Sequence, residues 1–313
     1  MEYINPYHFL NKHIHITDTT DLIGLKNIYS ITRNPPNILR YNNEVKQNIM
    51  NIFNLSSKMF EKHTVNFAKH IVKINKKDPN GFFRIINAYT LWGYGYYHFL
   101  TEVLPSVLEI SKPYTIYTMH SKFAQNVFQW FNIKNKICFE KPTFENVKES
   151  FEQQYIECGY PSPQKISLIR DIVLKKVSFT RKKGILIYRR EAIRRILNNS
   201  DVLDMLKRIF PSIDWIVFDV LPFSDTVELF SSASIIVAPH GAGLTNMLFS
   251  DSGINIIEFM PLQNPNPCYW HLSELMKNKY CMIPCITENG NFNIDIPNVE
   301  QIISSYAKEH NIQ

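Results

Sequence analysis

Features that define several protein classes are missing from this chain of 313 residues. It has no run of about 18 apolar residues, the length that a membrane-spanning helix needs, and it does not begin with the segments of a secretion signal. The five cysteines form no Cys-x-x-Cys pair, which favours free buried thiols over a disulfide framework. We therefore expect a cytoplasmic protein without a transmembrane segment, and peripheral contact with a membrane stays open.

Common motifs for binding nucleotides are also missing. No Asp-x-Asp occurs, so the sequence offers no paired carboxylates to hold a metal-bound nucleotide. The P-loop pattern is absent, and the stretch from Gly241 fails the Gly-x-Gly-x-x-Gly pattern because residue 246 is Asn. We expect no metal ion and no resident cofactor.

The composition excludes disordered and fibrous proteins. The chain is 45% hydrophobic, 13% aromatic and 20% charged, as in packed globular proteins, and its length suffices for two domains. Its net charge is only +6, which suits a small anionic ligand or a membrane surface better than a nucleic-acid duplex. A nucleic-acid binder is nevertheless one alternative, and strongly salt-dependent affinity for nucleic acid would support it.

The second half of the chain alternates strand-like and helix-like segments. Strands are expected over residues 185–188, 215–218, 234–238 and 255–259, with helices over 201–209 and 225–232 and from about 244. This order is typical of a parallel, doubly wound sheet. The first half contains strand-like segments at 81–89, 114–118 and 137–139 and a helical one at 122–131.

Residues 159–163, Gly-Tyr-Pro-Ser-Pro, suit a connection between two lobes. We expect a first lobe over 1–160, a second over 161–296 and a C-terminal helix over 297–313, for which packing back on the first lobe is one option. Within this last segment the helical pattern itself runs over Val299–Glu309, with Asn298 as its expected N-cap.

The most specific sequence pattern for a binding site follows the strand expected at 234–238. A turn with two glycines leads into a helix, whose first N–H groups would point at the carboxyl edge of the sheet and attract an anion. His240 and Thr245 add donors that suit phosphate oxygens. A plain tight turn with a satisfied histidine is the alternative. The candidate residues are His240, Gly241, Ala242, Gly243, Leu244, Thr245 and Asn246.

Four arginines occur within seven residues, Arg189 to Arg195, directly after the first strand of the second half. A guanidinium can donate two hydrogen bonds at once to the oxygens of a diphosphate, and ligands bind at the carboxyl ends of parallel strands. Arg189, Arg190 and Arg195 are therefore candidate ligand-binding residues, with a solvated basic loop as the alternative. Glu258 ends another expected strand and could accept the hydroxyls of a ribose, or it could be a surface charge.

Apolar residues recur at helical spacing between Tyr97 and Ile110, where Pro105 predicts a kink or a late start. His98 and Glu102 stand four residues apart on this helix and could form a base with its helper. An exposed ion pair without function is the alternative. One histidine and one carboxylate are too few ligands for a zinc site.

Together these stretches resemble glycosyltransferase family 61. Members of that family share an aromatic-His-aromatic-Leu-x-(Glu/Asp)-x-Leu-Pro segment, an arginine segment that ends in Arg-Ile-Leu-Asn, a His-Gly-Ala-Gly-Leu-Thr-Asn turn and a strand that ends in Glu. The corresponding segments here are Tyr97–Pro105, Arg189–Asn198, His240–Asn246 and Glu258, in the same order. The resemblance covers about residues 85 to 275.

The resemblance implies an α/β protein of GT-B type, in which two Rossmann-like lobes face each other across a cleft. It implies inverting, metal-independent transfer from a nucleotide sugar, with a UDP-linked donor in the second lobe and a glycan or glycoconjugate acceptor at the first. We assign the leaving diphosphate to Arg189, Arg195 and the His240 turn. Glu102 is our preferred base and His98 the second choice. A catalytically inactive nucleotide- or sugar-binding protein of the same fold is the main alternative.

Overall fold

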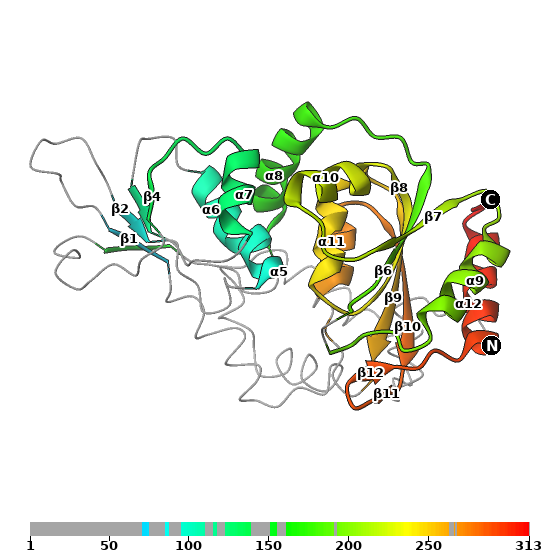
Figure 1. Cartoon of the computed structure of the whole chain (residues 1–313). Coiled ribbons are helices and arrows are strands. Elements are labelled where there is room, and N and C mark those ends of the chain that lie inside the picture. The colour runs from blue at the N-terminus through cyan, green and yellow to red at the C-terminus, as the bar shows by residue number, and fades with distance from the viewer. Residues whose placement is uncertain are drawn as a thin grey trace, which may run out of the picture. The chain divides into compact units, whose positions relative to one another are not determined.

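The computed structural model describes most of the chain from residue 71 onward (Figure 1). The described residues are 71–74, 85–87, 95–109, 115–117, 123–138, 151–154, 161–190, 193–262, 266 and 268–312. Contacts between backbone segments divide them into two units, with the boundary between Lys176 and Val177. The boundary lies one helix later in the chain than the lobe boundary that the sequence suggested.

The first unit contains a mixed sheet of five short strands, in the order β4-β3-β2-β1-β5. Strand β1 is antiparallel to both of its neighbours, whereas β2, β3 and β4 run parallel. The strands are β1 (Ile71–Ile74), β2 (Ile85–Asn87), β3 (Thr115–Tyr117), β4 (Ile137–Cys138) and β5 (Phe151–Gln154).

The helical segment that carries His98 and Glu102 is continuous but not uniform. It starts as α5 (Tyr96–His98), widens into the π-helix η3 (Phe99–Val103) and ends as α6 (Leu104–Leu108). Pro105 has no N–H to donate to the preceding turn, and the wide turn lies directly before it. The predicted helix is therefore confirmed, with a π-turn in the place where a kink was expected.

The buried side of this segment packs within the first unit. Helix α6 contacts α8 (Pro163–Lys176), and α7 (Ala124–Trp130) supplies further buried residues. The apolar residues that are at most 3% exposed in these helices are Phe99, Leu100, Val103, Leu104, Val107, Ala124, Val127, Ile166, Ile169 and Val173.

The second unit contains a parallel sheet of five strands in the order β10-β9-β8-β6-β7. The α/β class and the alternating element order predicted from the sequence are confirmed here. The elements are β6 (Lys183–Ile187), α9 (Asn199–Ile209), β7 (Asp214–Phe218), α10 (Phe223–Ser231), β8 (Ala233–Pro239), η5 (Ala242–Phe249), β9 (Asn255–Pro261), α11 (Cys268–Leu275), β10 (Lys279–Cys285) and α12 (Ile296–Glu309). A hairpin of β11 (Thr287–Glu288) and β12 (Asn291–Phe292) precedes α12.

Helices cover both faces of this sheet (Figure 1). Helices α9 and α12 pack together on one face, while α10 and α11 both contact η5 on the other. Val299, Ile302, Ile303 and Tyr306 of α12 belong to the hydrophobic core beside the sheet. The C-terminal helix therefore packs within the second unit.

Two predicted element starts differ from the structure. Asp295, not Asn298, is the N-cap of α12, and its side chain accepts a hydrogen bond from the Asn298 N–H. Pro297 fits in the first turn, where no N–H is needed, so the helix begins earlier than predicted. The helix expected from about residue 244 is instead the 3-10 helix η5, which begins at Ala242.

Candidate functional site

The candidate residues of the second unit gather at a topological switch point of its sheet. Strands β6 and β8 are neighbours, but the chain leaves β6 toward β7 and leaves β8 toward β9, on opposite sides. In doubly wound sheets, ligands bind outside the carboxyl ends of the two strands at such a point. Arg189 follows β6 and His240 follows β8, so the two predicted stretches meet at this edge.

Arg189 lies directly against the turn after β8. A Cβ atom on Gly241 would be 1.7 Å from the Arg189 Nη1 atom. Gly241 has an extended backbone (φ 164°, ψ 169°) that any residue can adopt, so the turn needs glycine here only for this close approach. A Cβ on Gly243 would likewise lie 2.9 Å from Cγ2 of Ile187.

The guanidinium of Arg189 has no acidic partner among the described residues. Burial, and to a smaller extent the charge of Arg194, lowers its pKa from the usual arginine value. The Nε atoms of Arg189 and Arg194 are both buried without a hydrogen-bond partner in the described part of the chain. Arg190, in contrast, pairs with Asp219 at 3.3 Å between Nε and Oδ2. Two unpaired arginines that repel one another form a site suited to an anion with more than one charge.

Arg194 is a member of this site that the sequence prediction did not name. Its backbone N–H donates to the Gly290 carbonyl at 2.7 Å, and its φ of 68° lies in the left-handed region. The side chain of Arg195 is exposed, and its carbonyl accepts a hydrogen bond from Phe292 at 2.9 Å. The sequence of the arginine segment does not show that Arg194 is half-buried and Arg195 exposed, because this difference depends on how the segment pairs with the β11–β12 hairpin.

His240 and Glu258 form a buried pair. The His240 Nδ1 atom lies 2.5 Å from Glu258 Oε1, and the Tyr280 hydroxyl donates to Glu258 Oε2. Burial, together with the Glu258 charge, raises the pKa of Tyr280 well above its usual value. Glu258 has no exposed surface and lies inside β9, not at its end. Its predicted role as a ribose ligand stays a prediction, and both of its oxygens already have partners.

The residues that follow Gly241 are largely enclosed. Leu244, Thr245 and Asn246 are buried in η5, and the Leu244 N–H donates to the Gly241 carbonyl at 3.0 Å. The Thr245 Oγ1 atom is buried without a hydrogen-bond partner among the described residues. Phosphate binding by this turn, which includes Ala242, stays a prediction.

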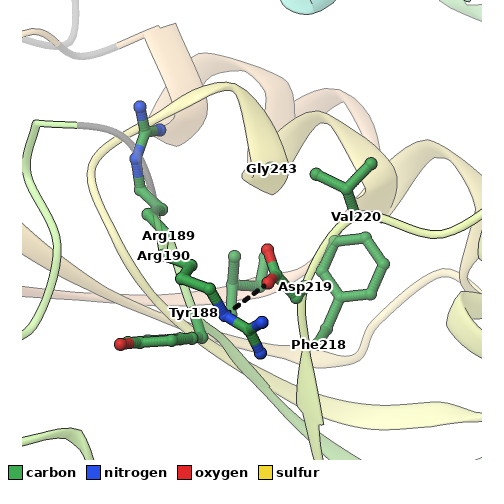
Figure 2. A pocket seen from close by; sticks show the side chains of 8 residues that line it. Tyr188, Arg189, Arg190, Phe218, Asp219, Val220 and Gly243 are labelled. Carbon is green, nitrogen blue, oxygen red and sulfur yellow. Dashed lines mark ion pairs between the residues drawn. The ribbon is translucent and has the colours of Figure 1, made fainter.

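A cavity of about 470 Å³ adjoins Arg189 (Figure 2). In the figure, Arg190 reaches toward Asp219 while the Arg189 side chain points away from them. The sequence prediction missed the part of the cavity lining at the end of β7, Phe218 to Val220, because no sequence motif marks these residues. The cavity is lined by Ile187, Tyr188, Arg189, Arg190, Phe218, Asp219, Val220 and Gly243.

His98 and Glu102 form a hydrogen-bonded pair in the first unit. The His98 Nδ1 atom lies 2.6 Å from Glu102 Oε1. The side chain of His98 is 25% exposed, while that of Glu102 is only 2% exposed. Glu102 can therefore orient the imidazole, whereas His98 is the member that external molecules can reach.

Two further observations concern metals and membranes. Within the described ranges, no group of three or more His, Cys, Asp or Glu side chains is placed to hold a metal ion. None of the helices in the same ranges is long and apolar enough to cross a bilayer. Metal independence and the cytoplasmic location stay predictions.

An α/β unit with a cationic edge at its switch point is the architecture of many nucleotide-binding proteins. The Glycosyltransferase 61 family model matches residues 96–257, which is more than half of the chain. The chain therefore belongs to the Glycosyltransferase 61 family. The matched range includes the His98–Glu102 pair, the arginine segment and the His240 turn, and it ends just before Glu258.

Two curated relatives are similar to the chain over shorter segments. The chain is 30% identical to the EGF domain-specific O-linked N-acetylglucosamine transferase of Drosophila melanogaster over 93 residues, which are 29% of this chain and 18% of that protein. It is 25% identical to Protein O-linked-mannose beta-1,4-N-acetylglucosaminyltransferase 2 of Tetraodon nigroviridis over 154 residues, which are 43% of this chain and 26% of that protein. The matched segments thus span less than a third of either relative.

Proposed function

We propose that this protein is an inverting, metal-independent glycosyltransferase of GT-B type, which moves a sugar from a UDP-linked donor to a hydroxyl of a glycan acceptor. The observation that carries the proposal is the position of Arg189. It lies against Gly241 at the switch point of a parallel sheet and has no acidic partner among the described residues. A diphosphate supplies the negative charge that this site lacks.

Arg189 would stabilise the leaving group. As the bond between the anomeric carbon and the diphosphate oxygen breaks, negative charge grows on the diphosphate. Fixed cationic donors that are already partly desolvated stabilise such charge without further rearrangement. Arg194 adds a second positive charge, and the first N–H groups of the His240 turn are candidate donors. These groups replace the metal ion that other glycosyltransferases use.

The His98–Glu102 pair would accept the proton of the acceptor hydroxyl. The sequence favoured Glu102 as the base, but the exposures favour His98 as the group that contacts the acceptor. Glu102 then acts as a positioning residue that holds the Nδ1 side of the imidazole, and His98 is the group that takes the proton. The new bond forms between the acceptor oxygen and the anomeric carbon, on the face opposite the departing diphosphate.

UDP-N-acetylglucosamine is the first donor to test, because both relatives are named as N-acetylglucosamine transferases. Activity should persist in EDTA. Complete loss in EDTA with recovery on addition of Mn²⁺ would refute metal independence.

The binding part of the proposal is tested by thermal unfolding with a panel of nucleotides. UDP at about 100 times its dissociation constant should stabilise the fold by about 2.7 kcal/mol. Arg189→Gln should weaken UDP binding by about 10-fold or more, as expected for loss of a charge-assisted hydrogen bond. Arg208→Gln is the matched control, since Arg208 is paired with Glu300 on the surface of α9. Equal effects of the two variants, or no stabilisation by UDP, would contradict the proposal.

A further inference from the structure

Two carboxylates near the edge of the second unit's sheet are candidates for binding a ribose. Glu258 is fully buried, and its oxygens are held by His240 and Tyr280. To bind a ribose it would have to give up a buried partner, which is costly. Asp219 is the other carboxylate, and no motif in the sequence drew attention to it.

Asp219, unlike the buried Glu258, has a partly exposed carboxylate that a ligand can reach. It is the first residue after β7, and its side chain is 36% exposed. Its described partner is Arg190, which is itself 69% exposed and contacts only the Oδ2 atom, at 3.3 Å. Ion pairs between exposed side chains contribute little stability, so a ligand can displace or share this contact.

The cavity beside Asp219 suits a nucleoside. Strands β6 and β7 are in parallel register with Ile187 opposite Phe218, so Asp219 follows β7 where Tyr188 and Arg189 follow β6. Phe218 and Val220 supply apolar surface, and Val220 is 90% exposed (Figure 2). A volume of about 470 Å³ lies within the usual range for small-molecule sites.

We propose that Asp219 accepts hydrogen bonds from the ribose hydroxyls of the donor nucleotide, whose nucleoside lies in this cavity. The inference rests on the proposed function, because it takes Arg189 as the diphosphate site. An acidic residue after the second strand of a doubly wound sheet has the same task in dinucleotide-binding folds. Asp219 is then the residue by which the protein distinguishes a ribonucleotide from a deoxyribonucleotide.

Calorimetric titration of the full chain with UDP, 2′-deoxy-UDP and 3′-deoxy-UDP tests this assignment. The wild-type protein should bind UDP about 10-fold or more tightly than at least one deoxy analogue, as expected for a hydrogen bond to a carboxylate. Asp219→Ala should remove that preference by weakening UDP binding while leaving the affinity for the analogue nearly unchanged. Asp251→Ala is the matched control, because Asp251 also pairs with an exposed arginine, Arg181, at 2.7 Å. It should keep the wild-type preference.

The outcomes separate the inference from the proposed function. If UDP binds and Asp219→Ala keeps the wild-type preference, another group contacts the ribose and the inference is wrong. Equal affinity of the wild-type protein for all three nucleotides would also overturn it. If no nucleotide binds to the wild-type protein, both the inference and the proposed function fail.

Discussion

The guanidinium of Arg189 occupies the space that a side chain on residue 241 would fill. This contact joins the arginine segment after β6 to the glycine turn after β8. The two stretches that the sequence marked as separate candidates are thus parts of one site at the sheet edge. The identity of residue 241 therefore determines where Arg189 can lie.

Gly241→Ala should displace Arg189 and weaken UDP binding by about 10-fold or more, as for the loss of a charge-assisted hydrogen bond. The extended backbone at this position accepts alanine, and the displaced atoms are the end of a flexible side chain. The midpoint of thermal unfolding should therefore change little. Calorimetric titration with UDP measures the loss.

A double-mutant cycle is the control for this effect. In the Arg189→Ala background, Gly241→Ala should cause no further loss of affinity, because nothing remains to be displaced. Additive losses would mean that Gly241 acts independently of Arg189.

Glu258→Ala should destabilise the fold by about 3 kcal/mol or more, as expected when one partner of a buried pair is removed. His240 and Tyr280 would both lose a buried partner. Tyr280→Phe removes only one of the contacts and should cost about 1 kcal/mol. Urea unfolding measures both variants. A Glu258→Ala protein that is as stable as the wild type and no longer binds UDP would instead favour the ribose role predicted from the sequence.

Asn198→Ala should destabilise the fold by about 2 kcal/mol, because two hydrogen bonds of ordinary strength are lost. The Asn198 side chain donates to the Ile294 carbonyl and accepts from the Ile294 N–H, both at 2.9 Å. The exposed Asn293→Ala is the control and should change stability by less than about 0.5 kcal/mol. Equal stability of the two variants in urea would show that this contact contributes nothing.

His98→Gln should lower kcat by about 10²-fold or more while leaving the KM for the donor nearly unchanged, since a proton acceptor is removed. Glu102→Gln should lower kcat less, because an amide oxygen can still hold the Nδ1–H of His98. Steady-state kinetics with a sugar acceptor measures both variants. If Glu102→Gln is inactive and His98→Gln keeps nearly full activity, Glu102 is the base.

The order of elements from β6 to β9 could be predicted, because the strands in this range are short apolar runs separated by helical patterns. The i,i+4 spacing also predicted that His98 and Glu102 share a helical face, and they hydrogen-bond to one another. Both predictions need only local periodicity. The start of α12 at Ile296 was missed because Pro297 resembles a break but fits in the first turn.

The parts of the site that depend on tertiary contacts could not be predicted. Arg194 and Arg195 are adjacent arginines, and only the pairing of this segment with the β11–β12 hairpin leaves one half-buried and the other exposed. Glu258 is buried and accepts a hydrogen bond from Tyr280, which lies on the neighbouring strand β10. Asp219 belongs to no sequence motif. It follows β7 at the level where Arg189 follows β6 only because the two strands pair in this register.

Release of UDP from UDP-sugars is the most direct test of the central claim, that Arg189 stabilises a nucleoside diphosphate leaving group. The wild-type protein should release UDP from at least one UDP-sugar, slowly to water and faster with a glycan acceptor. Arg189→Gln should slow this release by about 10²-fold or more, the effect of losing one strong donor to a developing charge. Arg208→Gln should match the wild type. Release by Arg189→Gln at the wild-type rate, or no release from any UDP-sugar by the wild-type protein, would contradict the account.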